Sequence, residues 1–176
     1  MPVSNTPKER GHLKERGHVK CPLSLFAMEI TLKNFQKKIP IPRAKILKAA
    51  KAAFRKLGKA AFLSIVFVGT KRMHAVNKKY LNHDYLTDVL TFDFGKSQQG
   101  EIIICPRVAA ANAKAHQTST ENEIILYVIH GILHLAGYDD QKTKDKIQMQ
   151  RMENELLKSI WSSYPTLTVV RHPRMF

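Results

Sequence analysis

Two histidines and an aspartate are spaced as if to bind one metal ion. His130 and His134 lie four residues apart in a run of helix-forming residues, so their side chains share one face of a predicted helix. Gly137 gives that helix a place to end, and Asp140 follows six residues after the second histidine. Two imidazoles and one carboxylate can occupy three corners of a tetrahedron around zinc and leave the fourth to water. This catalytic arrangement predicts a metal-dependent hydrolase.

The residue types at and near these positions indicate which metal ion is bound and which bond is hydrolysed. Zinc is the favoured ion, because imidazole is a borderline donor and zinc accepts one carboxylate beside it. Asp139 is the rival third donor, and we favour Asp140. Zinc peptidases of the His-Glu-x-x-His type use the glutamate as a base, but Gly131 stands at that position, which argues against a peptidase. A single metal can instead polarise a phosphoryl oxygen or acidify bound water, and both favour phosphodiester cleavage.

The charge balance points to a polyanionic partner. The chain of 176 residues holds 29 lysines and arginines against 14 acidic residues, a formal net charge of +15. Residues 1–27 contribute +3 of this, so residues 28–176 still carry +12. Nucleic acid is the first candidate for such a basic domain. No membrane partner is expected, because no apolar run approaches the length of a membrane span.

The chain is expected to form one domain over residues 28–160, with a basic N-terminal extension at 1–27 and a C-terminal tail at 161–176. A short polar motif occurs twice in the extension without any apolar period, so we expect it to be disordered. Strand-like alternation begins at Met28, which is therefore a candidate start of translation. Cys21 and Cys105 lack a metal-binding or disulfide pattern and indicate a reduced, cytoplasmic protein.

Hydrophobic periodicity predicts the secondary structure. Strands are expected at 28–34, 61–68, 88–94 and 101–105, the last two forming an antiparallel hairpin. Helices are expected at 42–57, 71–81, 106–117, 120–136 and 142–160. The helix at 120–136 carries the two histidines, and Thr120 with Glu123 forms a predicted capping box at its start. Its remaining surface is strongly apolar, so the metal site is expected on a buried helix and the turn after it.

Five basic residues on two predicted helices are candidates for contact with RNA phosphates. Three lie on the non-apolar surface of the helix at 42–57, and two lie near the end of the helix at 71–81: Lys45, Lys48, Arg55, Lys78 and Lys79. A merely solvated basic face is the alternative interpretation of the first helix.

Several blocks of the chain, in order, resemble the YbeY family of bacterial endoribonucleases and ribosomal RNA maturation factors. They are Asn77-Lys78-Lys79-Tyr80, Asp84 with Thr87-Asp88-Val89-Leu90-Thr91-Phe92, Gly100-Glu101-Ile102-Ile103-Ile104, and the segment from His130 to Asp139. The resemblance covers residues 28–160 and implies a zincin-like α+β fold with a mixed four-stranded sheet beside helices. It also implies one zinc ion per chain, action on single-stranded RNA such as the 16S rRNA precursor, and the small ribosomal subunit and its proteins as partners.

Two positions depart from the pattern of that family. Asp140 stands where the family usually has a third histidine, and Leu81 stands where it commonly has an arginine. Aspartate can bind zinc together with two histidines, so the site is expected to persist with an altered metal affinity. Leucine cannot stabilise the charge that develops on a phosphorane, so lower activity or a substitute cation is expected.

These observations predict a cytoplasmic, zinc-dependent endoribonuclease that is specific for single strands. It would act in maturation of the 3′ end of 16S rRNA and in late quality control of the 70S ribosome. His130 and His134 are the predicted catalytic residues, and with Asp140 they are the predicted metal ligands. The alternative is a non-catalytic assembly factor that binds precursor rRNA and whose fold zinc stabilises.

Overall fold

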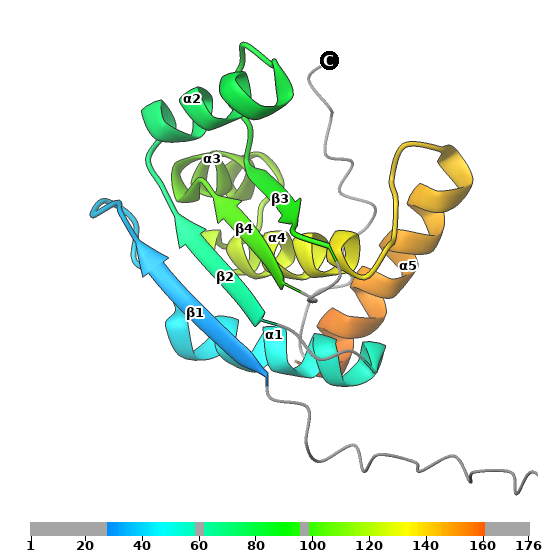
Figure 1. Cartoon of the computed structure of the whole chain (residues 1–176). Helices are drawn as coiled ribbons and strands as arrows, with labels where there is room; N and C mark the ends of the chain where they lie inside the picture. The colour runs from blue at the N-terminus through cyan, green and yellow to red at the C-terminus, as the bar shows by residue number, and fades with distance from the viewer. Residues whose placement is uncertain (1–27, 59–61, 96–98, 161–176) are drawn as a thin grey trace, which may run out of the picture.

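A computed structural model describes residues 28–58, 62–95 and 99–160 (Figure 1). The predicted extension at 1–27 and the predicted tail at 161–176 lie outside these residues, so both remain predictions. Among the helices of the described segments, none combines the length and the apolar character that crossing a membrane requires.

Within the described segments, four strands form one mixed sheet, as the sequence predicted (Figure 1). They are β1 (Glu29–Asn34), β2 (Phe62–Phe67), β3 (Val89–Asp93) and β4 (Gln99–Ile104). The strand order is β1-β2-β4-β3, with β1, β2 and β4 parallel. β3 runs antiparallel to β4, which confirms the predicted hairpin and leaves β3 at an edge of the sheet.

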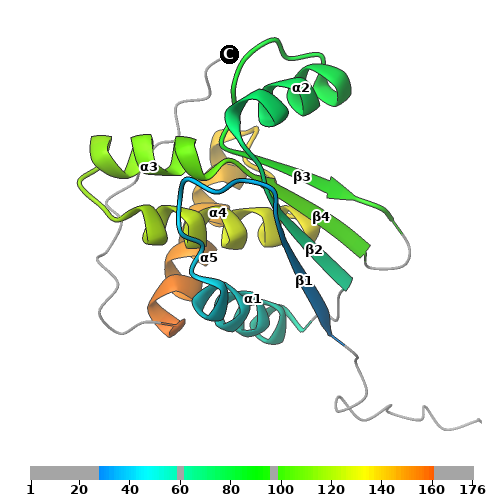
Figure 2. The same cartoon turned by 90° about the vertical axis from the view of Figure 1, so that its left-hand side faces the viewer.

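The helices of the described segments also agree with the expected positions. They are α1 (Arg43–Leu57), α2 (Thr70–Leu81), α3 (Pro106–Ala115), α4 (Thr120–Leu135) and α5 (Thr143–Ile160). α1, α4 and α5 lie on one side of the sheet, and α3 packs against α4 (Figure 2). The chain is therefore an α+β protein, which confirms the predicted fold class.

Alternation along the two central strands builds two apolar cores. Ile65 of β2 and Ile102 of β4 belong to the core formed with α1, α4 and α5. Val66 and Ile103, the next residue on each strand, belong to a second core with Met73 of α2. Because neighbouring residues of a strand point to opposite faces, a strand covered on both faces becomes a continuous apolar run. The strand expected at 61–68 is observed as β2, over Phe62–Phe67, and it is covered on both faces.

α4 begins at Thr120 as predicted, but the predicted capping residue was wrong. The N-cap is Ser119 rather than Thr120, and the Ser119 hydroxyl accepts the backbone N–H of Asn122 at 3.1 Å. Glu123 thus lies one position too late to complete a capping box. Its buried carboxylate instead accepts the hydroxyl of Thr118 at 2.8 Å.

α4 lies unusually close to β4. A β-carbon placed on Gly131 would lie 2.7 Å from Cδ1 and 3.0 Å from Cγ2 of Ile102. A β-carbon on Gly100 of β4 would lie 2.6 Å from Cδ1 of Leu135. Both distances are shorter than van der Waals contact, so a glycine on each element lets the helix and the strand meet. The position of the helix, and hence of its histidines, depends on this contact.

We expect Gly131→Ala to lower the free energy of unfolding by about 1 kcal/mol. Alanine favours the helix by ~1 kcal/mol, but overpacking a core costs ~1–3 kcal/mol. Ile102 is branched at Cβ and fully buried, so its side chain has little freedom to turn away. Urea unfolding followed by circular dichroism measures the change. In the Ile102→Val background, which lacks the nearest atom Cδ1, the loss should be smaller; strictly additive effects would contradict the contact.

Candidate metal centre

After α4 the chain folds back over the C-terminal turn of that helix. Gly137 adopts a left-handed conformation with φ of 93°. The N–H of Tyr138 donates to the carbonyl of Leu133 at 3.0 Å, and the N–H of Gly137 donates to the carbonyl of His134 at 2.9 Å. These two bonds form a Schellman motif, in which glycine is favoured because other residues are strained at positive φ. The expected helix exit at Gly137 is confirmed.

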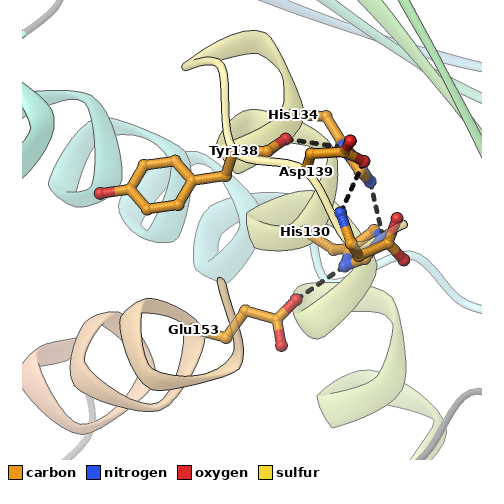
Figure 3. A network of polar contacts seen from close by, with 6 residues as sticks. His130, His134, Tyr138, Asp139 and Glu153 are labelled. Atoms are coloured by element: carbon orange, nitrogen blue, oxygen red, sulfur yellow. Dashed lines mark hydrogen bonds and ion pairs between the residues drawn. The ribbon is translucent and has the colours of Figure 1, made fainter. Parts of the chain in front are cut away.

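The two imidazoles of α4 face each other across one helical turn (Figure 3). Nε2 of His130 lies 3.0 Å from Nε2 of His134. The ligand atoms of both rings and a carboxylate oxygen of Asp140 all lie within 4.8 Å of one another. Ligands at zinc–ligand distances around a tetrahedral ion are about 3.3 Å apart. Small side-chain adjustments would therefore let all three residues hold one ion.

The neighbouring aspartate has a different role in the turn. Asp139 is exposed, and its Oδ1 accepts the backbone N–H of Asp140 at 2.7 Å and of Gln141 at 3.1 Å. The half-buried Asp140 is the one whose carboxylate reaches the histidines. Asp139 thus shapes the turn that presents Asp140.

Each imidazole is also held from behind, through its Nδ1 atom (Figure 3). Nδ1 of His130 lies 2.7 Å from Oε1 of Glu153 on α5, and Nδ1 of His134 lies 3.1 Å from the main-chain carbonyl of Tyr138. Carboxylate and carbonyl oxygens only accept, so these partners assign a proton to Nδ1 of both rings. The two Nε2 atoms are thereby directed at each other, and either one shared proton or a metal ion between them can relieve this contact.

The surroundings shift the basicity of the two rings in opposite directions. Burial disfavours the charged form of both. At His130 the hydrogen bond and charge of Glu153, together with the charge of Asp140, outweigh burial and raise the pKa above its ordinary value. At His134 burial acts together with the charge of His130 and lowers the pKa. His134 is therefore neutral at pH 7, which is the form that binds metals.

Glu153 is the residue of this site that the sequence analysis missed. It lies one turn after Met149 and one turn before Leu157, which are both buried residues of α5. The side chain of Glu153 is only 14% exposed. A carboxylate within the apolar stripe of a helix was the available signal, because a buried charge requires a partner. Only the packing of α5 against α4 identifies that partner as His130.

The packing of α4 also explains why Gly131 replaces the glutamate of a zinc peptidase. A β-carbon at this position would run into Ile102 of the sheet. The position faces the core, so no base could be carried there without displacing β4. The structure thus adds a steric reason to the earlier argument against a peptidase.

The three predicted phosphate contacts on α1 are exposed but do not converge on the histidines. Lys45 forms an ion pair with Glu121, which lies in the first turn of α4, at the end remote from the metal centre. Nε of Arg55 donates to a main-chain carbonyl of its own helix at 3.3 Å. Lys48 lies between them on α1. These three residues form a separate basic surface, and their contact with RNA stays a prediction.

The two predicted contacts on α2 lie on the opposite side of the sheet from α1. Nζ of Lys78 is 2.8 Å from a carboxylate oxygen of Asp84. Nζ of Lys79 lies 5.2 Å from the centre of the Tyr80 ring. Leu81 ends the helix and is 47% exposed. The structure therefore does not bring the five basic residues together, and RNA contact by this pair also stays a prediction.

Asn77, the first residue of the Asn-Lys-Lys-Tyr block, has a structural role. It is 1% exposed, and its side-chain amide donates to the carbonyl of Tyr85 at 2.8 Å. This bond fastens the loop between α2 and β3 to the helix. The adjacent Tyr80 remains on the surface, 60% exposed.

The fold and the site together define an α+β protein with a candidate metal centre on a buried helix. A family model described as "Endoribonuclease YbeY" matches residues 31–161. The match covers most of the chain, so the chain belongs to the endoribonuclease YbeY family, a family of hydrolases that act on RNA. This confirms the resemblance found in the sequence.

Curated relatives and a solved structure agree with this assignment. The Endoribonuclease YbeY of Chlorobium phaeovibrioides is 31% identical over 134 residues, which cover 74% of this chain and 90% of that protein. The Endoribonuclease YbeY of Elusimicrobium minutum is 35% identical over 105 residues, 56% of this chain and 73% of that protein. The solution structure of TM1509 from Thermotoga maritima superposes with a TM-score of 0.58 at 27% identity, covering 76% of this chain and 89% of that chain.

Removing the carboxylate behind His130 should weaken metal binding. We expect Glu153→Ala to lower the affinity for zinc by about 10–100-fold, because the imidazole loses the partner that orients it and makes it more basic. Glu153→Gln should lose less, since an amide oxygen still accepts the Nδ1 proton. Competition with a chromophoric chelator measures both affinities. Glu155→Gln is the matched control, because Glu155 lies on the same helix but pairs with Lys56 at 3.2 Å; a similar loss there would contradict the assigned role.

Proposed function

We propose that this protein is a zinc-dependent endoribonuclease that cuts single-stranded RNA. The observation that carries the proposal is the pair of Nε2 atoms of His130 and His134, 3.0 Å apart, with both Nδ1 atoms held from behind. This arrangement directs both Nε2 atoms and a carboxylate oxygen of Asp140 to one place, where one ion could be shared. Membership of an endoribonuclease family supports RNA as the substrate.

Each residue of the proposed site has a defined task. His130 and His134 hold the ion through Nε2, and Asp140 holds it through a carboxylate oxygen. Glu153 and the carbonyl of Tyr138 keep the two rings in the metal-binding orientation and tautomer. When bound, zinc supplies Lewis acidity towards a phosphoryl oxygen and lowers the pKa of a water molecule to about 7. The +12 charge of residues 28–176 supplies attraction for the polyanionic substrate.

The donor set is the reason for proposing zinc. Two imidazole nitrogens and one carboxylate oxygen suit a borderline ion, whereas Mg²⁺ and Ca²⁺ prefer oxygen ligands alone. Compared with three histidines, Asp140 reduces the net charge of the occupied centre from +2 to +1. This change favours holding the cation and weakens its pull on an approaching phosphate.

The finer functional assignment belongs to the same proposal. We propose that the substrate is the precursor of 16S rRNA, cut during maturation of its 3′ end, and that the protein also acts in late quality control of the 70S ribosome. The small ribosomal subunit and its proteins would then be its partners, and the cytoplasm its location. Family membership supports this assignment because the family acts on RNA.

A non-catalytic assembly factor is the second candidate, and Leu81 is the observation that favours it. This exposed side chain ends α2 at the position where the resemblance implies an arginine, a residue that could stabilise a phosphorane. In this alternative the metal would stabilise the attachment of α5 and the turn at Gly137 to α4. RNA would be bound through the basic surfaces and not cut.

Loss of one proposed ligand should remove both metal and activity. We expect Asp140→Ala to lower zinc affinity by more than about 100-fold, beyond the loss from an orienting residue, and His134→Ala to abolish stoichiometric binding. Elemental analysis of the purified proteins and cleavage of a labelled single-stranded RNA provide the two readouts. Asp139→Asn is the control, because an amide oxygen can still accept the N–H bonds of the turn.

The outcomes separate the two candidates. An enzyme requires that wild type and Asp139→Asn bind about one zinc and cut RNA, while His134→Ala binds RNA without cutting it. A wild type that binds zinc and RNA but never cuts would establish the assembly factor. A wild type without affinity for zinc would refute the proposed centre.

A further inference from the structure

Three aromatic side chains line the edge of the sheet next to α2, on the side away from the histidines. Phe92 lies opposite Glu101 in the β3–β4 ladder, and the N–H of Phe94 continues the ladder to the carbonyl of Gln99 at 3.0 Å. Alternation therefore places Phe92 and Phe94 on the same face of the sheet. Tyr80 of α2 packs edge-on against Phe92, with ring centres 5.4 Å apart. We call Tyr80, Phe92 and Phe94 the aromatic edge.

Packing does not account for the aromatic edge. Phe92 is partly buried against the core beneath α2, but Tyr80 and Phe94 are 60% and 61% exposed. Two large rings left in water on adjacent elements are more than the fold needs, and such patches usually mark a binding surface. The rings are flat and lie in succession along one edge, which suits flat ligands.

The charges beside the aromatic edge select an anionic ligand. α2 has no acidic residue, and of its four basic residues two are engaged elsewhere: Arg72 lies over Phe35 at the other edge of the sheet, and Lys78 pairs with Asp84 at 2.8 Å. Nζ of Lys79 lies over the Tyr80 ring itself. The nearest acidic side chain on this face of the ladder, Glu101, projects from the inner strand β4, so phosphates are directed towards α2 and away from the centre of the sheet.

We propose that the aromatic edge stacks the unpaired bases of single-stranded RNA while α2 binds the adjoining phosphates. Aromatic rings beside a basic track are the usual means of holding single strands without reading their sequence. A duplex keeps its bases stacked inside, so only a single strand can offer them to these rings. This inference rests on the proposed function and deepens it, because it gives a physical origin to single-strand specificity.

The position of β3 connects this surface with the candidate metal centre. α4 packs against β3 on the face opposite to the aromatic edge. The aromatic edge and the helix that carries the histidines therefore lie on opposite faces of the same edge strand.

The test uses the full-length, metal-loaded chain carrying both Tyr80→Leu and Phe94→Leu. Leucine keeps an apolar side chain at these exposed positions and removes the stacking surface. The probes are a fluorescent thymidine oligomer of about 12 nucleotides, matched to typical single-strand site sizes, and an abasic oligomer of the same length. Both are DNA, which an endoribonuclease does not cut. Fluorescence polarisation gives the dissociation constants, and circular dichroism checks that the fold is retained.

We expect the double variant to bind the thymidine oligomer at least about fivefold more weakly, since each stacked base contributes ~1–3 kcal/mol. Its affinity for the abasic oligomer and the slope of affinity against salt should not change, because the phosphate contacts persist. Phe35→Leu is the matched control: Phe35 is 57% exposed beneath the guanidinium of Arg72, but it follows β1 at the other edge of the sheet. Its affinity should equal that of wild type.

Three outcomes would overturn the proposal. They are an unchanged affinity of the double variant for the thymidine oligomer, an equal loss with the abasic oligomer, and an equal loss in Phe35→Leu. The first would leave the aromatic edge as a surface for a protein. The proposed function is tested separately, by the zinc content of the wild-type protein and its cleavage of single-stranded RNA. Neither measurement depends on the stacking variants.

Discussion

The structure depends on how two imidazoles are accommodated on the most buried helix of the fold. α4 is covered by the sheet, α1, α3 and α5, and a polar group buried without a partner costs ~1–3 kcal/mol. His130 and His134 avoid this cost through Glu153 and the carbonyl of Tyr138. Those two partners fix the rings from outside, so the inner nitrogens have no alternative to facing each other. The same contacts that satisfy the buried histidines therefore preorganise them as candidate ligands.

The contacts that hold the two histidines bring together segments that are far apart in the sequence. Glu153 ties α5 to α4, and the Schellman motif at Gly137 ties the following turn to the same helix. Gly131 lets α4 approach β4, which places the histidines beside the edge strand. A site whose orienting residues come from separate elements is rigid before a ligand arrives, so little binding energy is lost in ordering it. Folding and site formation are one process here.

Local patterns made most of the fold and the three candidate ligands predictable. Periodicity located the strands and helices, because a 3.6-residue or 2-residue repeat reports which face is buried. His130, His134, Gly137 and Asp140 could be found because all lie within one helix and the turn that ends it. Glu153 could not be assigned, since its partner is 23 residues away and their contact arises from helix packing. The cap at Ser119 was missed because Thr120 offers the same hydroxyl one residue later. The aromatic edge was also not visible, because register and the position of α2 decide which rings meet.

The two departures from the family pattern act on the same electrostatic quantity. In the proposed centre, Asp140 would add a negative charge beside the ion where the resemblance implies a neutral histidine, and Leu81 is uncharged where it implies an arginine. Both differences lower the positive charge that the chain would offer to a phosphodiester. Screening limits the reach of exposed lysines to about 8 Å at physiological ionic strength, so the basic surface on α1 cannot fully replace local charge. Attraction that salt screens little has to come from contacts such as base stacking, whose strength does not depend on charge. The aromatic edge, on the opposite face of the same edge strand, would supply contacts of this kind.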